Sequence, residues 1–221
     1  MFNVAIDGPA GAGKSTIAKM VAKKMNLVYV DTGSMYRAMA LSCIRQGIKA
    51  DEHEKVAQAV KDINITLEYE DGVQQVILNG ENVNVYIRTE EVGNMTSAIA
   101  AYGEVRERLV AMQQAIAREK EVIMDGRDIG TCVLKDAPVK IYLTAASKTR
   151  AKRRYLELKE KGQECDIDTI EKDIIDRDYR DMHREISPLK QAEDAILVDS
   201  SDMTIQQVVD TISDIIRERI K

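Results

Sequence analysis

The chain contains no tryptophan and a single phenylalanine, and eight tyrosines make up the rest of its aromatic residues. Because proteins that bind single-stranded nucleic acids stack bases on aromatic side chains, this scarcity argues against such a role. The formal net charge of -5 argues in the same direction, since nucleic-acid binding depends on a basic surface. A local basic cluster for a small anionic substrate is compatible with this balance.

Cysteine is also scarce, and Cys43, Cys132 and Cys165 are widely spaced along the chain. No pair has the spacing of a metal site, and an odd number of cysteines does not indicate a disulfide framework. We therefore expect reduced thiols in a cytoplasmic protein. No signal peptide is visible, and no apolar run approaches the length needed to cross a membrane. The prediction is a cytoplasmic protein with no membrane partner.

The 221 residues contain enough apolar sequence for a core, since 44% are hydrophobic and 31% carry charges of mixed sign. This length predicts one domain. Short apolar runs alternate with amphipathic helical patterns, which predicts an α/β fold with a parallel five-stranded sheet flanked by helices. The runs expected to form the core strands are residues 2–6, 27–30, 122–124, 139–143 and 196–198.

Helices are predicted between these strands, because apolar residues recur there every three or four positions. Asp51 is expected to cap one helix, which ends near Asp62. The first helix is expected to begin directly after a glycine-rich stretch at residues 8–16. The later helices are expected at about residues 35–47, 51–62, 102–120, 147–161, 168–184 and 204–221, and helical patterns already return from Thr89.

The alternation of strands and helices is broken at about residues 63–88. Residues 64–69, 73–78 and 83–87 each alternate between apolar and polar side chains, as half-buried strands do. An Asp-Gly pair and an Asn-Gly pair lie between them, and these are strong hairpin signals. The sequence therefore predicts a small three-stranded antiparallel insert outside the main sheet.

The most specific motif is GPAGAGKST at residues 8–16, which fits the phosphate-loop pattern G-x-x-x-x-G-K-[ST]. A buried strand before it and a helix after it form the required context, which disfavours a chance match by a glycine-rich turn. The glycines let backbone N–H groups converge on phosphates, and the helix N-terminus adds partial positive charge. Lys14 is expected to reach the β- and γ-phosphates of ATP, and the Ser15 hydroxyl to bind Mg²⁺. The residues expected to bind ATP are Gly8, Pro9, Ala10, Gly11, Ala12, Gly13, Lys14, Ser15 and Thr16.

Polar groups also follow other predicted strands at their carboxyl ends, where ligands of a parallel sheet bind. Asp125 is a candidate for binding Mg²⁺ through water. A helix cap or an ion pair with Arg127 is an equally good interpretation, and Asp128 could compete for the metal. Arg37 and Arg127 directly follow strand-end turns, and a guanidinium group binds phosphate through two parallel hydrogen bonds. They are therefore stronger candidates for phosphate binding than a lone arginine, which is usually solvated.

Five segments together resemble the bacterial cytidylate kinases, which are P-loop NTPases of the nucleoside monophosphate kinase superfamily. The resemblance covers essentially the whole chain. The phosphate loop alone is shared by thousands of proteins, whereas the other four segments in this order are specific. The segments are GPAGAGKST at 8–16, DTGSMYR at 31–37, the insert followed by IRTEEVGNMTSAIAAYGEVR at 87–106, DGRDIGT at 125–131, and DRDYRDMHREISPL at 176–189.

The resemblance implies a single nucleoside monophosphate kinase domain over residues 1–221, with three moving parts. These are a core, a monophosphate-binding lobe at about residues 32–106 that includes the insert, and a helical lid at about residues 147–166. Lid arginines, Arg153 among them, would fold over ATP. The resemblance also implies that the protein is a monomer.

The implied activity is transfer of the γ-phosphate of ATP to CMP or dCMP, with Mg²⁺ as cofactor. The products would be CDP or dCDP and ADP, within pyrimidine nucleotide metabolism. Lys14, Arg127 and Arg184 would be the catalytic residues, and Ser15 and Asp125 would bind the metal. The CMP-binding positions implied by the family are Arg37, Arg127 and Arg184 for the phosphate, Ser97, Arg106 and Asp128 for cytosine, and Thr32, Arg177 and Asp181 for the sugar.

Other classes of protein also contain a phosphate loop. A different small-molecule kinase on the same fold is the closest alternative, and a panel of phosphate acceptors distinguishes the two. A GTP-driven switch needs an Asp-x-x-Gly turn and an Asn-Lys-x-Asp guanine reader, and neither occurs in the sequence. A nucleic-acid motor conflicts with the chain length and the acidic balance.

Overall fold

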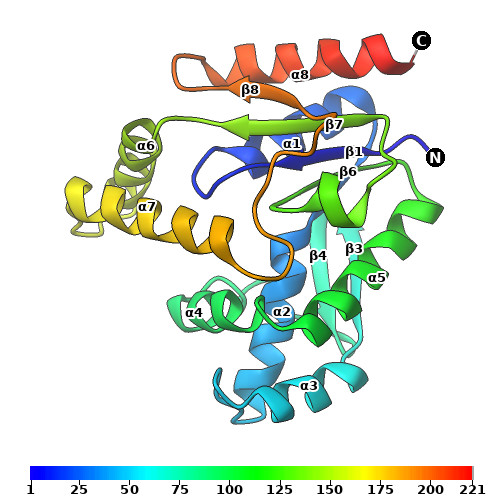
Figure 1. The fold of residues 1–221 in the computed structure, drawn as a ribbon, viewed down its shortest axis with the longest axis vertical. Helices are drawn as coiled ribbons and strands as arrows, with labels where there is room; N and C mark the ends of the chain where they lie inside the picture. The colour runs from blue at the N-terminus through cyan, green and yellow to red at the C-terminus, as the bar shows by residue number, and fades with distance from the viewer. Residues whose placement is uncertain (221) are drawn as a thin grey trace. The chain divides into compact units, whose positions relative to one another are not determined.

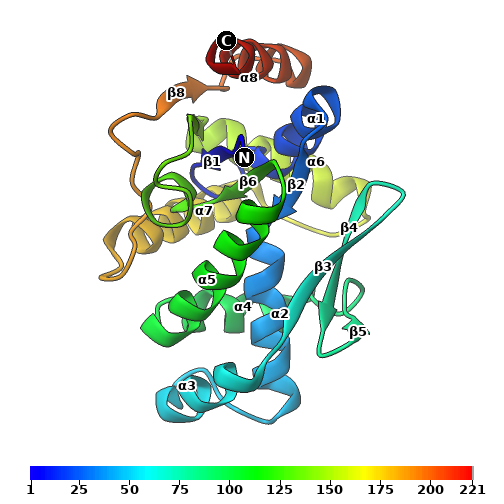
Figure 2. The same cartoon turned by 90° about the vertical axis from the view of Figure 1, so that its right-hand side faces the viewer.

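The structure, a computed structural model, describes residues 1–220 (Figures 1 and 2). The chain divides into two compact units. The first unit contains Met1–Tyr29 together with Glu121–Lys221, and the second contains Val30–Lys120. The chain therefore leaves the first unit within one strand and returns to it after one long helix.

The main sheet has five strands in the order β2-β6-β1-β7-β8. Its ladders of β1 with β6 and β7, and of β7 with β8, are parallel, which confirms the predicted α/β fold. The register places Asp7 of β1 opposite Gly126 of β6 and Tyr142 of β7. The carboxyl ends of the three central strands therefore meet at one edge. The strands are β1 (Val4–Asp7), β2 (Val28–Asp31), β6 (Val122–Gly126), β7 (Val139–Thr144) and β8 (Ile196–Asp199).

The helices of the first unit pack on this sheet or on one another through apolar side chains. Val208, Ile212 and Ile216 of α8 are buried in the same core cluster as Val4 and Ile123 of the sheet. Figure 1 shows α8 beside β8, and helices α6 and α7 as a pair. The helical elements are α1 (Lys14–Met25), α6 (Ser147–Glu160), α7 (Ile167–His183), α8 (Ile205–Ile220) and a five-residue π-helix, η1 (Ile129–Val133).

The second unit is built around α2 (Thr32–Arg45). Asp31 begins this helix, because its Oδ1 accepts a hydrogen bond from the backbone N–H of Ser34 at 3.0 Å. Met35 and Met39 are fully buried and belong to the core of this unit. Figure 2 shows strands β3 and β4 as a long hairpin. The remaining elements are α3 (His53–Asp62), β3 (Ile65–Glu70), β4 (Val73–Leu78), β5 (Glu81–Asn82), α4 (Glu90–Ile99) and α5 (Gly103–Glu119).

The antiparallel insert exists as predicted, but its third strand was placed wrongly. That strand is the two-residue segment Glu81–Asn82, and residues 84–87 form turns instead. The backbone N–H of Ile87 donates to the carbonyl of Val83 at 3.2 Å, and both side chains are buried. The apolar residues at 83 and 87 therefore lie on one side of a turn rather than on one face of a strand.

The predicted cap of α3 is also wrong. The helix begins at His53, and the N-cap position is occupied by Glu52 rather than Asp51. The Glu52 carboxylate accepts a hydrogen bond from the backbone N–H of Lys49 at 2.8 Å and pairs with Lys55. It therefore stabilises the turn that leads into the helix.

Candidate active site

The phosphate-loop sequence forms the connection between β1 and α1, in the first unit. Gly11 and Gly13 have positive φ angles of 74° and 85°, which L-residues with side chains rarely adopt. At Gly8 a Cβ atom would lie 2.0 Å from the carbonyl oxygen of Leu143 in β7, so no side chain fits there. The loop conformation therefore requires the glycines that the motif specifies.

Lys14, the first residue of α1, is buried, with 6% of the residue exposed. Its Nζ donates a hydrogen bond to the carbonyl of Pro9 within the loop at 2.7 Å. Burial lowers the pKa of Lys14 well below its usual range, and the positive charge of Arg127 lowers it further, against three nearby carboxylates. An anionic group bound in the loop would favour the charged form of this lysine.

Ser15 and Asp125, the two predicted metal ligands, lie in contact. The Ser15 hydroxyl donates to Oδ2 of Asp125 at 2.8 Å, and the Tyr29 hydroxyl donates to Oδ1 at 2.8 Å. A hydroxyl and a carboxylate are the hard oxygen donors that Mg²⁺ prefers, so the residues present fit this ion. Arg127 pairs with another carboxylate, and Asp128 contacts a different arginine. Which of the interpretations of Asp125 holds stays a prediction.

Two segments about fifty residues apart supply a second set of predicted site residues. Arg127 Nε donates to Oδ2 of Asp181 at 2.9 Å, and both side chains are about four-fifths buried. Arg184 Nη2 lies 3.8 Å from Oδ1 of Asp128, and its Nε donates to the carbonyl of Ser187 at 2.6 Å. The fold of the first unit therefore brings together four charged side chains that the resemblance assigns to CMP. Arg177 lies on α7 with Asp181 and is exposed.

Asp7 lies at the same edge of the sheet, and its role is not apparent from the sequence. Its Oδ1 and Oδ2 accept hydrogen bonds from the backbone N–H groups of Ile129 and Gly130, each at 2.7 Å. Burial raises the pKa of Asp7 to about 6, although these two hydrogen bonds lower it. The available signal was an acidic residue at the end of an apolar strand, directly before the loop.

Arg150 is a second residue whose role the sequence did not reveal. The residue is buried, and its Nη1 donates to the carbonyl of Ala10 in the phosphate loop at 2.8 Å. Its Nη2 pairs with Asp178 of α7 at 2.6 Å. Arg150 therefore connects the loop to both helices of the α6–α7 pair. Arg153, the predicted ATP-binding arginine, donates to the backbone carbonyl of Ser200 at 2.7 Å.

The remaining predicted CMP-binding residues lie in the second unit. Thr32 is buried at the start of α2, and Arg37 Nη1 on the same helix donates to the carbonyl of Ile87 at 3.3 Å. Burial lowers the pKa of Arg37, and the neighbouring Arg88 lowers it further. Two other members of the set lie on α4 and α5: the Ser97 hydroxyl donates to Gly93 O at 3.1 Å, and the Arg106 guanidinium lies over the Tyr36 ring at 5.8 Å.

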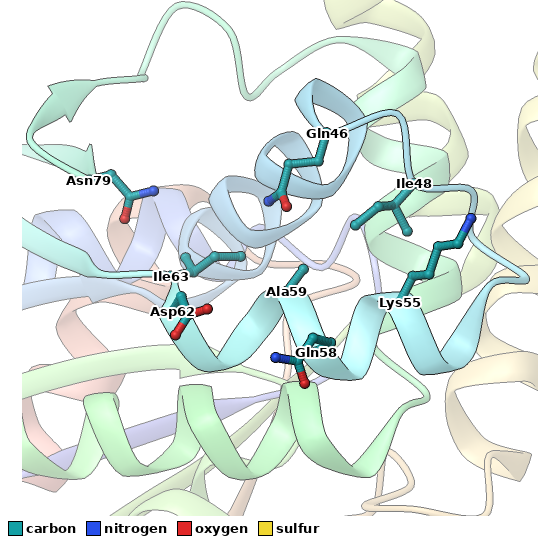
Figure 3. A pocket seen from close by; sticks show the side chains of 8 residues that line it. All are labelled: Gln46, Ile48, Lys55, Gln58, Ala59, Asp62, Ile63 and Asn79. Atoms are coloured by element: carbon teal, nitrogen blue, oxygen red, sulfur yellow. The ribbon is translucent and has the colours of Figure 1, made fainter.

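One pocket, of about 350 Å³, also lies in the second unit (Figure 3). It contains none of the predicted site residues and no arginine. Its one cationic side chain, Lys55, is paired with Glu52 at 2.6 Å. These groups do not suit a phosphate, so the pocket is not the candidate active site. Its lining consists of Gln46, Ile48, Lys55, Gln58, Ala59, Asp62, Ile63 and Asn79.

Within residues 1–220, no group of three or more His, Cys, Asp or Glu side chains is arranged to hold a metal ion. In the described part of the chain, every helix is too short or too polar to span a bilayer.

Comparison with known proteins places the sequence in a well-defined family. A family model described as cytidylate kinase matches residues 4–218. The cytidylate kinase of Caldicellulosiruptor saccharolyticus is 50% identical over 208 residues, which cover 94% of this chain and 92% of that protein. The cytidylate kinase of Leuconostoc mesenteroides subsp. mesenteroides is 50% identical over 219 residues, which cover 99% of this chain and 98% of that protein.

Solved structures with the same fold are more distant in sequence. An uncharacterized protein from Eubacterium ventriosum has a TM-score of 0.53 and 14% identity, with 98% of each chain covered. A shikimate kinase from Bacteroides thetaiotaomicron has a TM-score of 0.51 and 12% identity, with 99% of this chain and 98% of that chain covered. At this level of identity the similarity supports the fold alone.

Proposed function

The chain belongs to the cytidylate kinase family, and from this premise we propose that it transfers the γ-phosphate of ATP to CMP and dCMP. The products are CDP or dCDP and ADP. The observation that carries the proposal is the charge cluster of the first unit. There the positive charge of Arg127 lowers the pKa of Lys14 in the phosphate loop, and the negative charge of Asp181 raises it. A lysine suited to the donor phosphates and an arginine suited to the acceptor phosphate therefore lie close enough to interact electrostatically.

ATP binding is assigned to the loop from Gly8 to Thr16. Its backbone N–H groups and the N-terminus of α1 attract the triphosphate, and Lys14 contacts the β- and γ-phosphates. Ser15 and Asp125, which are 2.8 Å apart, would hold Mg²⁺. When bound, Mg²⁺ neutralises part of the negative charge of the phosphates. Arg153 contributes from α6.

The catalytic residues in this proposal are Lys14, Arg127 and Arg184. Phosphoryl transfer depends mainly on positioning and on neutralising charge, so no general base is assigned. Arg37, Arg127 and Arg184 hold the CMP phosphate, since each guanidinium presents several N–H donors in a plane. Arg127 would exchange part of its contact with Asp181 for the phosphate.

The base is read by three side chains with complementary hydrogen-bonding groups. Cytosine presents an exocyclic amine, which suits the Asp128 carboxylate and the Ser97 hydroxyl, while Arg106 suits its acceptors. Uracil presents a carbonyl in place of the amine, so Asp128 and Ser97 would face an acceptor. The Ser97 hydroxyl can donate to it, whereas the buried Asp128 carboxylate has no hydrogen to donate. An unpaired buried polar group costs about 1–3 kcal/mol, which favours CMP over UMP by roughly tenfold or more.

The sugar is approached by Thr32, Arg177 and Asp181. The family often has serine at the first of these positions, and threonine keeps the hydroxyl group. We also propose that about residues 32–106 form the monophosphate-binding lobe and that about residues 147–166 form the lid. Lid closure would exclude water, so that ATP is not hydrolysed without an acceptor.

The cellular setting is part of the proposal. We assign the enzyme to the cytoplasm, as a monomer, in pyrimidine nucleotide metabolism. Cys43, Cys132 and Cys165 are free thiols, which is consistent with a reducing compartment. The acidic overall charge is consistent with small-molecule partners rather than nucleic acid.

The direct test is a coupled assay with purified protein, ATP, Mg²⁺ and a panel of acceptors. CMP and dCMP are expected to be phosphorylated faster than UMP, AMP, GMP and shikimate. If all four of the latter outpaced CMP, the chain would be a kinase for another acceptor.

A variant of the base-reading carboxylate tests the site itself. Asp128→Ala removes a buried group that would bind the cytosine amine, and hydrogen bonds to charged groups contribute about 1.5–3 kcal/mol. The kcat/KM for CMP is expected to fall roughly tenfold to a hundredfold, with KM for ATP changed by less than about twofold. Asp136→Ala, which removes an exposed carboxylate of the same unit, is the matched control. An equal loss for CMP in both variants would argue against the assignment of Asp128.

A further inference from the structure

Asp7, the last residue of β1, carries an almost fully buried carboxylate, with 4% of the residue exposed. Its two oxygens accept hydrogen bonds from the backbone N–H groups of Ile129 and Gly130, each at 2.7 Å. These residues open the π-helix η1, and N–H groups at the start of a helix have no acceptor within it. The carboxylate of Asp7, which lies 122 residues before Ile129 in the sequence, therefore caps this helix.

Gly130 allows the carboxylate to come this close. A Cβ atom at position 130 would lie 3.3 Å from Oδ2 of Asp7 and 3.2 Å from Cδ of Lys140. Both distances are shorter than ordinary van der Waals contacts. A methyl group at position 130 would therefore require a shift of Asp7, of the Lys140 side chain or of the start of η1.

The backbone of Asp7 is held independently of its side chain. Parallel ladders fix it on both sides, opposite Gly126 of β6 and Tyr142 of β7. The next residue, Gly8, begins the phosphate loop. Loss of the carboxylate would therefore leave the start of the loop in place and release the start of η1.

Only Arg127 and Asp128 lie between the end of β6 and the start of η1. The sheet fixes one end of this two-residue connection, and the hydrogen bonds to Asp7 fix the other. The negative charge of Asp128 contributes to the raised pKa of Asp7, so the two carboxylates are near one another. The orientation of Arg127 and Asp128 is thus linked to the Asp7 side chain.

We propose that Asp7 is a positioning residue for acceptor recognition, because its carboxylate fixes Arg127 and Asp128 in the orientation that binds CMP and rejects UMP. This inference rests on the proposed function, in which Arg127 holds the CMP phosphate and Asp128 reads the cytosine amine. The inference predicts that CMP binding and ATP binding respond differently to loss of the carboxylate. Loss of the carboxylate weakens CMP binding and base selectivity by a larger factor than it changes ATP binding, which depends on Asp7 only through the charge near Lys14.

The first test uses Asp7→Asn. Asparagine keeps the size of the side chain, but its NH₂ group cannot accept a hydrogen bond, so one of the two N–H groups loses its acceptor. The Kd for CMP, measured by calorimetry, is expected to rise about tenfold, and the CMP-to-UMP ratio of kcat/KM to fall about tenfold. The Kd for ATP is expected to change by a clearly smaller factor, through the charge that Asp7 places near Lys14.

Two further variants make the test specific. Gly130→Ala disturbs the same contact from the other side and is expected to lower the CMP-to-UMP ratio as well. Asp178→Asn is the control, because it removes another buried carboxylate of the first unit, the partner of Arg150, and should leave this ratio unchanged.

Turnover of CMP by the wild-type protein is measured first. Its absence would contradict the proposed function, whereas the variants test this inference once turnover is present. The inference is overturned if Asp7→Asn and Gly130→Ala both keep the wild-type CMP-to-UMP ratio. It is also overturned if Asp7→Asn weakens ATP and CMP binding by the same factor.

Discussion

At the scale of single residues, Asp7 makes the stability of the protein depend on pH. Burial raises the pKa of its carboxyl group from 3.8 to about 6, against the hydrogen bonds from Ile129 and Gly130 and the charge of Lys14. Between about pH 4 and pH 6 the folded protein therefore holds a proton that the unfolded chain has lost. The contribution of this group to stability is present below pH 4 and is lost as the pH rises through 6.

This shift can be measured with the uncharged variant as reference. Two pKa units correspond to about 3 kcal/mol, so the free energy of unfolding of Asp7→Asn should gain about that much relative to wild type between pH 4 and pH 7. Urea denaturation of both proteins at several pH values gives the difference and cancels the titration of all other groups. A difference that stays constant with pH would show that the Asp7 pKa is not raised.

The sequence revealed some residues of the candidate site and missed others for a clear reason. Ser15 and Asp125 can be paired from the sequence, because one belongs to the phosphate loop and the other follows an apolar strand of the same sheet; their role in metal binding stays a prediction. The contacts of Asp7, Tyr29 and Arg150 join segments about 100 residues or more apart. No local pattern encodes such pairs, since only the strand order brings them together.

At the scale of elements, the start of the phosphate loop packs directly against β7. At Gly8 the Leu143 carbonyl leaves no space for a side chain. Gly8→Ala would place a methyl group 2.0 Å from the Leu143 carbonyl, and a main-chain atom cannot move away as a side chain can. Inserting an extra methyl group into a well-packed site destabilises a protein by about 1–3 kcal/mol and occasionally more. A contact with a fixed main-chain oxygen is expected at the upper end of this range. We expect a loss of about 3 kcal/mol in the free energy of unfolding, measured by urea denaturation.

Gly47→Ala is the control for replacing a glycine that has a positive φ angle and no close neighbour. Gly47 has a φ of 69° but no atom within 4 Å of a Cβ, so the expected cost is only about 1 kcal/mol. Equal losses for the two variants would contradict the role of the contact between Gly8 and Leu143.

Most elements could be predicted because they are long enough to show a period. The five apolar runs became strands, and the expected helices lie within a few residues of their observed bounds. The π-helix Ile129–Val133 could not be predicted, because five residues are too few for a periodic pattern and its cap comes from Asp7. The strand predicted at residues 83–87 is wrong, because its buried apolar residues Val83 and Ile87 flank a turn.

At the scale of the whole molecule, the chain is organised as two compact units with different parts of the proposed chemistry. The first contains the phosphate loop, Asp125 and the charged cluster around Arg127. The second, Val30–Lys120, contains the whole of the lobe expected at about residues 32–106. The sequence predicted these parts only through the family resemblance, since composition does not change at either boundary. The role of the lobe in binding CMP stays a prediction.

The central claim, direct phosphoryl transfer between two nucleotides, is tested most directly by following the γ-phosphate. ATP labelled at this position is incubated with CMP, Mg²⁺ and the purified protein, and the products are separated. The label should appear in the β-phosphate of CDP, with none transferred when a chelator removes the metal. Release of the label as inorganic phosphate at the same rate with and without CMP would contradict the account.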